Sequence, residues 1–130
     1  MLVLLLRLGG VITVSAFLAM FLPVEWMSAI HEAIGLGELP RAPVVVSLAR
    51  SIAALYGFHG VLLLLISTDV VRYRLLVWYV AIMNVLFGLI VTVIDLQAGM
   101  PRLWTFLEGP PICVYGILIA VLNRSRPRSG

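Results

Sequence analysis

The most restrictive feature of the sequence is the stretch from Val44 to Ser67, VVVSLARSIAALYGFHGVLLLLIS, which contains no proline and is mostly apolar. A transmembrane helix needs about 20 predominantly apolar residues, and this stretch supplies them. It also carries Arg50, Tyr56 and His59. A charge inside such a helix is costly unless a partner compensates it. The stretch therefore predicts a spanning helix and, around Arg50, a polar site.

The composition indicates a membrane protein throughout. Of the 130 residues, 62% are hydrophobic and 12% are charged, with a mean hydropathy of +1.14. Soluble domains carry about 25% charged residues, so the chain is outside their range. The net charge of +3 comes from arginines that gather partly at the C-terminus, which favours contact with anionic lipids over nucleic acid. We expect one membrane domain over residues 1–130, with no nucleic-acid partner.

Three further stretches predict spanning helices. The last of them is placed by length: a helix beginning at Pro110 would be too short for a bilayer core of about 30 Å, so it must begin near Pro101. Glu108 then lies inside the membrane. The predicted fold class is an all-α integral membrane protein, a four-transmembrane-helix bundle. Its spanning helices cover residues 3–22, 44–67, 75–97 and 101–123.

A shorter helix is predicted between the first two spanning helices, over residues 23–35. Apolar residues recur there at helical spacing on one side: Trp26, Met27, Ile30 and Ile34. The segment is too short and too polar to span. Pro23 marks its start, and Gly35 or Gly37 marks its end. We expect a short interfacial helix with Trp26 as its anchor.

Small residues follow one face of the stretch from Val44 to Ser67. Ala49, Ala53 and Gly57 are spaced four apart, and Gly60 lies beside them. Small residues stacked in this way let another helix approach closely. We therefore expect Ala53 and Gly57 to face a neighbouring helix.

The arginines orient the chain. With both termini in the cytoplasm, six of the nine arginines lie on or near that side, as the positive-inside rule favours. The other three are Arg41, Arg50 and Arg102. We expect a multi-pass protein of the cell inner membrane with both termini cytoplasmic.

Arg50 has two candidate partners. By helical rise, Arg50 and Glu108 each lie about 9 to 10 Å from the outer ends of their helices, and Asp95 lies somewhat nearer the surface. Intramembrane ionisable residues are functional-site candidates. The sequence predicts a ligand-binding or ion-pair site of Arg50, Asp95, Glu108 and Tyr56. A purely structural ion pair among them is the alternative.

Two histidines and an asparagine are secondary candidates. We interpret His59, near mid-membrane, as a neutral histidine that hydrogen-bonds to Asn84, Tyr79 or a backbone carbonyl, with a proton or ligand role as the alternative. His31 lies among carboxylates, but their spacing matches no metal-binding motif, so we expect a solvated polar face and no metal. The sequence identifies no cofactor.

Several short motifs follow one another between residues 40 and 123. They are Arg50 followed by ALYG, the basic connector RYR, the pair FG, and then Asp95, Gly99, Pro101 and Glu108. In order and spacing they resemble the small DoxX-like families, four-helix bacterial membrane proteins that include many domains of unknown function. The resemblance implies the fold and the site at Arg50, Asp95 and Glu108. It implies no redox centre.

The chain lacks the usual signatures of catalysis. It has no Walker loop, no GxGxxG, no GxSxG and no nucleophile–base pair, so we favour a non-enzymatic role. We expect an accessory subunit or binding module with an outward-facing intramembrane site. Its partners would be membrane lipids, other membrane subunits or a second copy, and a quinone or lipid ligand. The alternative is a small transporter or proton-coupled carrier in which Glu108 titrates.

Overall fold

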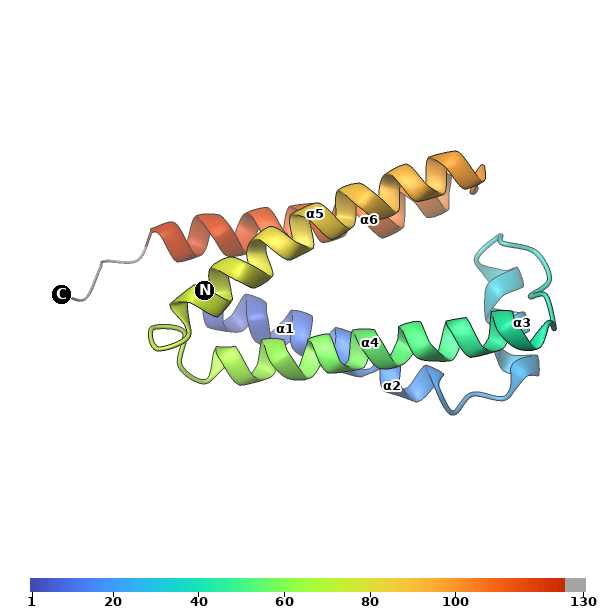
Figure 1. Cartoon of the computed structure of the whole chain (residues 1–130), viewed down its shortest axis with the longest axis horizontal. Coiled ribbons are helices and arrows are strands. Elements are labelled where there is room, and N and C mark those ends of the chain that lie inside the picture. The colour runs from blue at the N-terminus through green and yellow to red at the C-terminus, as the bar shows by residue number, and fades with distance from the viewer. Residues whose placement is uncertain (126–130) are drawn as a thin grey trace. The chain divides into compact units, whose positions relative to one another are not determined.

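The structure is a computed structural model that describes residues 1–125, and over these residues its regular elements are all helices (Figure 1). The elements are α1 (Leu2–Val14), α2 (Ala16–Ala19), α3 (Val24–Ala33), α4 (Pro43–Ser67), α5 (Arg74–Ala98) and α6 (Arg102–Arg124). The bounds of α4, α5 and α6 agree with the predicted spans to within one residue. Arg126 and Arg128, which enter the charge argument, lie outside the described residues.

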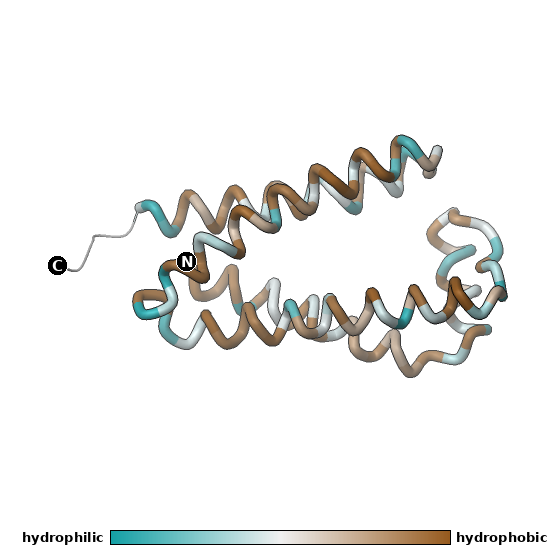
Figure 2. The backbone as a smooth tube through the Cα atoms, in the orientation of Figure 1, coloured by the Kyte–Doolittle hydropathy of each residue, from teal (hydrophilic) through white to brown (hydrophobic). Residues whose placement is uncertain are grey.

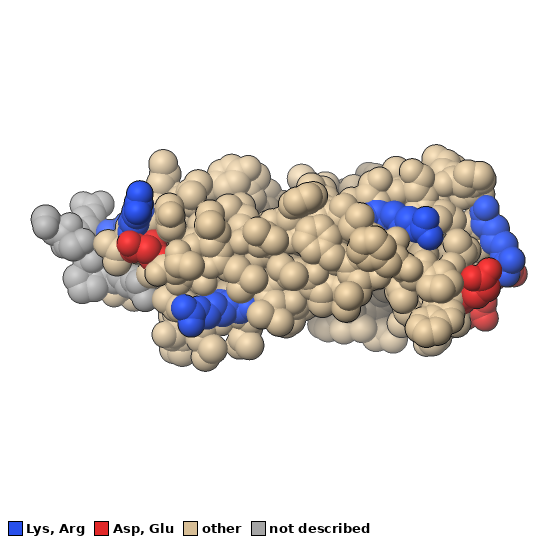
Figure 3. Space-filling model, turned by 90° about the horizontal axis from the view of Figure 1, so that it is seen from below, with Lys and Arg blue, Asp and Glu red and all other residues tan. Residues whose placement is uncertain are grey.

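Four helical segments are long and apolar enough to cross a membrane: Leu2–Ala19, α4, α5 and α6. Hydrophobic residues dominate them (Figure 2), and many of their large apolar side chains are exposed, with Leu55 at 69% and Leu103 at 67%. Few charged side chains interrupt the face in Figure 3. Apolar surface this extensive is typical of proteins that contact lipid. The predicted all-α class with four candidate spans is therefore confirmed.

The first span differs from the prediction, which had one continuous helix over residues 3–22. The helix is interrupted at Ser15, between α1 and α2. The Ser15 hydroxyl donates to the Ile12 carbonyl at 2.6 Å, and the Thr13 hydroxyl donates to the Gly9 carbonyl at 2.8 Å. Hydroxyls that bond to carbonyls of the preceding turn compete with the helical ladder and often bend helices. The bonds from Leu18 to Ser15 and from Met20 to Phe17 span three residues instead of four.

The segment before α4 forms the predicted short helix, α3. The helix ends in a Schellman motif, in which Gly35 at φ 82° donates to Glu32 and the Leu36 amide donates back to His31. Only glycine adopts this left-handed conformation without strain. Trp26 and Ile30 are exposed at 64% and 52%, which suits an interfacial helix; its position in a membrane stays a prediction.

Packing divides the chain into two compact units, one of residues 7–65 and one of residues 1–6 together with 66–130. In the unit of residues 7–65, the small residues of α4 face α1 and α2. A Cβ added to Gly57 would lie 2.6 Å from the Phe17 ring, and one added to Gly60 would lie 2.7 Å from the Gly10 carbonyl oxygen. Ala53 is buried at 8% exposed. The prediction that Ala53 and Gly57 face another helix is confirmed.

In the other unit, α5 and α6 run antiparallel and side by side (Figure 1). Glycines again permit the close approach: a Cβ on Gly88 would lie 2.6 Å from the Gly109 carbonyl oxygen, and one on Gly116 would lie 2.7 Å from that of Ala81. Val77 and Ile119 are fully buried. The Tyr115 hydroxyl donates to the Leu5 carbonyl at 3.3 Å and so ties α6 to the start of α1.

Candidate functional site: a carboxyl pair at the α5–α6 turn

The turn between α5 and α6 is fixed by glycine and proline. Gly99, at φ 69°, donates to Leu96, and the Met100 amide donates to the Asp95 carbonyl at 3.0 Å, which is a second Schellman motif. Pro101 then precedes the first residue of α6. The motif fixes the last turn of α5, which carries Asp95.

Asp95 is a buried acid on α5. Its side chain is 6% exposed, and its Oδ2 atom has no hydrogen-bond partner in the structure. A buried polar atom without a partner costs stability, and ionised groups cost most. The position therefore requires an explanation beyond packing.

Glu108 on α6 is the neighbouring residue that bears on the buried position of Asp95. The Glu108 side chain is half-buried and interacts electrostatically with the Asp95 carboxyl group and with the Trp104 side chain. Trp104 lies one turn before Glu108, so the indole and the carboxyl group share one side of α6. The structure thus brings together two of the predicted site residues, Asp95 and Glu108.

Two prolines lie directly after Glu108 within α6, Pro110 and Pro111. Neither has an N–H, so the carbonyls of Phe106 and Leu107 lose the donors that they would have in a regular helix. This leaves acceptor groups next to the carboxyl pair. The α6 segment beside the pair is therefore rich in acceptors and poor in donors.

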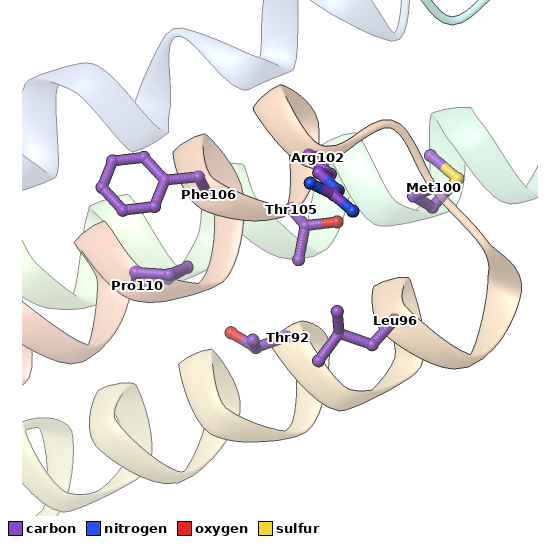
Figure 4. A pocket seen from close by; sticks show the side chains of 7 residues that line it. All are labelled: Thr92, Leu96, Met100, Arg102, Thr105, Phe106 and Pro110. Atoms are coloured by element: carbon purple, nitrogen blue, oxygen red, sulfur yellow. The ribbon is translucent and has the colours of Figure 1, made fainter.

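A pocket of about 240 Å³ opens between α5 and α6 near the turn that joins them (Figure 4). Its lining is mostly apolar and comes from both helices and the turn: Thr92, Leu96, Met100, Arg102, Thr105, Phe106 and Pro110. The Thr92 hydroxyl donates to the Gly88 carbonyl at 2.7 Å, and the Thr105 hydroxyl donates to the Pro101 carbonyl at 3.4 Å. Arg102 is the charged member of the lining.

Arg50 lies on α4 in the other unit, and its pairing with either carboxyl group stays a prediction. Its side chain is exposed, and its Nη2 donates to the Leu22 carbonyl at 3.4 Å. Leu22 follows α2, where the helical ladder has ended, so the guanidinium satisfies a carbonyl at that end. Tyr56, half-buried on the same helix, likewise stays a predicted member of the site.

The secondary candidates have local surroundings of their own. Asn84 is buried, and its Nδ2 donates to the Val80 carbonyl at 2.8 Å. The His31 Nδ1 lies 2.7 Å from the Gly37 carbonyl oxygen, which holds the loop after α3. His59 is half-buried within α4. Within residues 1–125, no three side chains of the His, Cys, Asp and Glu types lie close enough together to hold a metal ion.

Sequence reasoning missed several residues of this site. It gave Trp104 no role in the site, although the spacing of four residues between Trp104 and Glu108 was a usable signal. The pocket residues Thr92, Thr105 and Met100 carry no pattern of their own, because a pocket depends on how two helices cross. Outside the site, near the other end of α6, Asn123 is 1% exposed with an unpartnered Nδ2, and the sequence analysis did not identify it.

Comparison with known proteins adds no relative: no family model, no curated protein and no solved structure matches the chain.

Proposed function

We propose that the chain is a non-catalytic, multi-pass membrane protein that binds an amphiphilic ligand, such as a quinone or a lipid, at the α5–α6 turn. The observation that carries this proposal is the mostly apolar pocket between α5 and α6, with Arg102 in its lining. Ligand pockets are typically apolar with a few polar groups that fix orientation. This pocket has that composition.

The lining suggests how such a ligand would lie. Leu96 and Phe106, exposed at 68% and 70%, offer apolar contact to a ring or an acyl chain. The Arg102 guanidinium offers hydrogen-bond donors to a phosphate or carbonyl oxygen of the head. Arg50 is proposed as a second positive group, as the sequence predicts.

Filling the pocket tests the proposal. Leu96→Trp should reduce the amount of lipid or quinone that the purified protein retains, measured by native mass spectrometry from mild detergent. The matched control is Leu89→Trp, two turns earlier on α5, also exposed and not part of the lining. Equal retention in the two variants would contradict binding at this pocket.

The same spectra separate two modes of action. An accessory subunit should arrive with other subunits in fixed ratio, whereas a carrier should arrive as a homo-oligomer. The interaction between Asp95 and Glu108 favours a proton-coupled carrier as the second candidate, because paired intramembrane carboxyl groups are typical of proton pathways. A transporter built on this chain would need a second copy, since alternating access usually requires repeated halves.

We further propose that both termini are cytoplasmic, that the α3 helix lies at the outer face, and that the membrane is the bacterial inner membrane of the DoxX-like resemblance. The arginine asymmetry supports this orientation. In a Cys113→Ser background, a cysteine at Glu38 should react with an impermeant reagent on intact cells, and one at Ser129 should not. The opposite pattern would reverse the topology.

A further inference from the structure

The pocket between α5 and α6 has its charged residue at one end. Arg102 and Met100 lie at the turn, whereas Thr92, Phe106 and Pro110 lie further along the two helices (Figure 4). From Arg102 to Pro110 the rise along α6 is about 12 Å, at about 1.5 Å per residue. In the proposed topology the turn lies at the bilayer surface, because it joins two spanning helices. The pocket then runs from a charged end at the surface to a mostly apolar end in the bilayer core.

The Arg102 guanidinium is the free hydrogen-bond donor among the side chains of the lining. It is exposed and takes part in no hydrogen bond or ion pair within residues 1–125. A hydroxyl group has one hydrogen to donate, and those of Thr92 and Thr105 are donated to backbone carbonyls of their own helices. The other lining side chains are apolar. The side chains of the pocket would therefore hold a polar head group at its charged end.

The lining carries a positive charge and no acid. Arg102 is its charged residue, and the others are neutral. A guanidinium binds a phosphate through two parallel N–H donors, and such charge-assisted bonds are stronger than bonds to a neutral carbonyl. A head group that also contained an ammonium would place a second cation near Arg102, with no carboxylate in the lining to compensate it. The lining therefore favours a phosphate head group with a net negative charge.

The size of the pocket and the position of its donor distinguish a phospholipid from a quinone. A quinone ring has carbonyl oxygens on opposite sides, whereas the lining offers a side-chain donor at one end. Pockets that enclose a small ligand typically measure about 300 to 1,000 Å³, and this one measures about 240 Å³. Its volume suits a ligand that stays partly in the bilayer. A phospholipid is such a ligand, because its phosphate lies in the surface layer and its acyl chains lie in the hydrocarbon core.

We propose that the ligand of this pocket is an anionic phospholipid. Its phosphate binds the Arg102 guanidinium, and one acyl chain lies along the pocket against Leu96 and Phe106. Basic pockets between spanning helices bind anionic head groups in other membrane proteins. The inference rests on the proposed function, because it names the ligand class of the site proposed there.

Lipid titration followed by native mass spectrometry tests the proposal on the purified whole chain. The probes are dioleoyl phosphatidylglycerol and dioleoyl phosphatidylcholine, which have the same acyl chains and differ in net charge. The wild type should bind one phosphatidylglycerol about tenfold more tightly than phosphatidylcholine. Arg102→Gln should abolish this preference, because it removes the positive charge and the paired donors. The matched control is Arg41→Gln, a change at an exposed arginine ahead of α4 and outside the lining, which should keep the preference.

Two further arms separate the acyl chain from the head group. Phe106→Ala removes apolar surface from the pocket, so it should weaken the binding of both lipids by the same factor and leave the preference unchanged. Inorganic phosphate at millimolar concentration should not displace phosphatidylglycerol, because it has no chain to contact the pocket.

The wild-type comparison needs no variant, and equal binding of the two lipids would overturn the proposal. A preference that survives in Arg102→Gln would also overturn it, as would displacement of the lipid by inorganic phosphate or by an equal concentration of a quinone. If Leu96→Trp lowers ligand retention while Arg102→Gln keeps the preference, this inference fails and the proposed function stands. If neither variant changes binding, both fail.

Discussion

Glycines bring helices close together in both units of this protein, but the residues around the two contacts differ. In the unit of residues 7–65, α4 approaches α1 and α2 through glycines, and the side chain that meets Gly57 is aromatic: Phe17, whose ring packs edge to face against Phe58 with ring centres 5.3 Å apart. In the other unit, α5 and α6 also approach through glycines. Yet that unit holds five of the six buried polar residues of the described chain: Ser67, Asn84, Asp95, Thr105 and Asn123.

The difference between the two contacts shows that close helix packing and the presence of polar groups are separate features. Glycine at a helix contact brings backbones together whatever lies beside it. Where the neighbours are aromatic, the contact needs no further partner. Where the neighbours are acids and hydroxyls, as around Gly109, close approach brings polar groups out of reach of water and forces them to pair with one another. A small-residue face thus indicates where helices meet, and the residues beside it indicate whether the contact carries chemistry.

The largest expected effect tests the pairing of Arg50 with Glu108 that the sequence predicts. If Arg50 neutralises the two carboxyl groups, as the sequence predicts, Arg50→Leu and Glu108→Leu should each lower the free energy of unfolding in detergent by about 3 to 5 kcal/mol, because each leaves a charge without its partner in an apolar environment. The double variant should recover much of that loss. Denaturant unfolding of the four proteins measures the coupling.

The control for this cycle is Arg41→Leu, which removes an exposed arginine ahead of α4 and should change stability by no more than about 0.5 kcal/mol. Strictly additive losses in Arg50→Leu and Glu108→Leu would show that the two units have separate charge balances.

A smaller effect distinguishes the two glycine contacts. A Cβ on Gly109 would clash with Thr92 and lie 2.6 Å from the Gly88 carbonyl oxygen, so backbone must move. We expect Gly109→Ala to cost about 3 kcal/mol, the upper part of the usual range for overpacking. The three atoms nearest to a Cβ on Gly57 all belong to the Phe17 ring, a side chain that can rotate, so Gly57→Ala should cost about 1 kcal/mol.

Unfolding midpoints in one detergent provide the measurement. The gain in helix propensity from glycine to alanine is the same at both sites, so it cancels in the difference. Equal losses, or a larger loss at Gly57, would contradict the distinction between a backbone and a side-chain neighbour.

The smallest effect belongs to the loop after α3. Ser28 is buried at 6% exposed, accepts the Leu39 amide at 3.3 Å and donates to Glu32 at 3.2 Å. Ser28→Ala should leave that buried amide unpaired and cost about 1 kcal/mol. Faster hydrogen exchange at Leu39 reports the loss directly. Ser47→Ala on the exposed side of α4 should leave that exchange unchanged.

The helices were predictable because their signals are local. Apolar length placed α4, α5 and α6, and the argument that α6 must begin before Pro110 put Glu108 inside a helix, where the structure has it. The break at Ser15 was not predictable from hydropathy, since a hydroxyl that bonds within its own helix leaves apolar length unchanged.

The candidate site was predictable only in part. Depth along each helix indicated that Asp95 and Glu108 lie near the same end, but it assigned each a positive partner. Their interaction with each other depends on how closely α5 and α6 approach at Gly88 and Gly109. Helical rise fixes height and says nothing about which faces meet. The positions of Gly88 and Gly109 indicate which faces of α5 and α6 meet. The sequence analysis used small residues in this way only for α4.

The short connection from Gly99 to Pro101 also constrains how the protein is made. If the chain spans a bilayer as proposed, three residues hold the ends of α5 and α6 together, so we expect the insertion machinery to take the two helices up as one helical hairpin, released only after α6 has left the ribosome. Until then α5 presents Asp95 without Glu108. A nascent chain of which α5 alone has left the ribosome should therefore stay at the insertion machinery, and one of which α6 has also left it should partition into lipid.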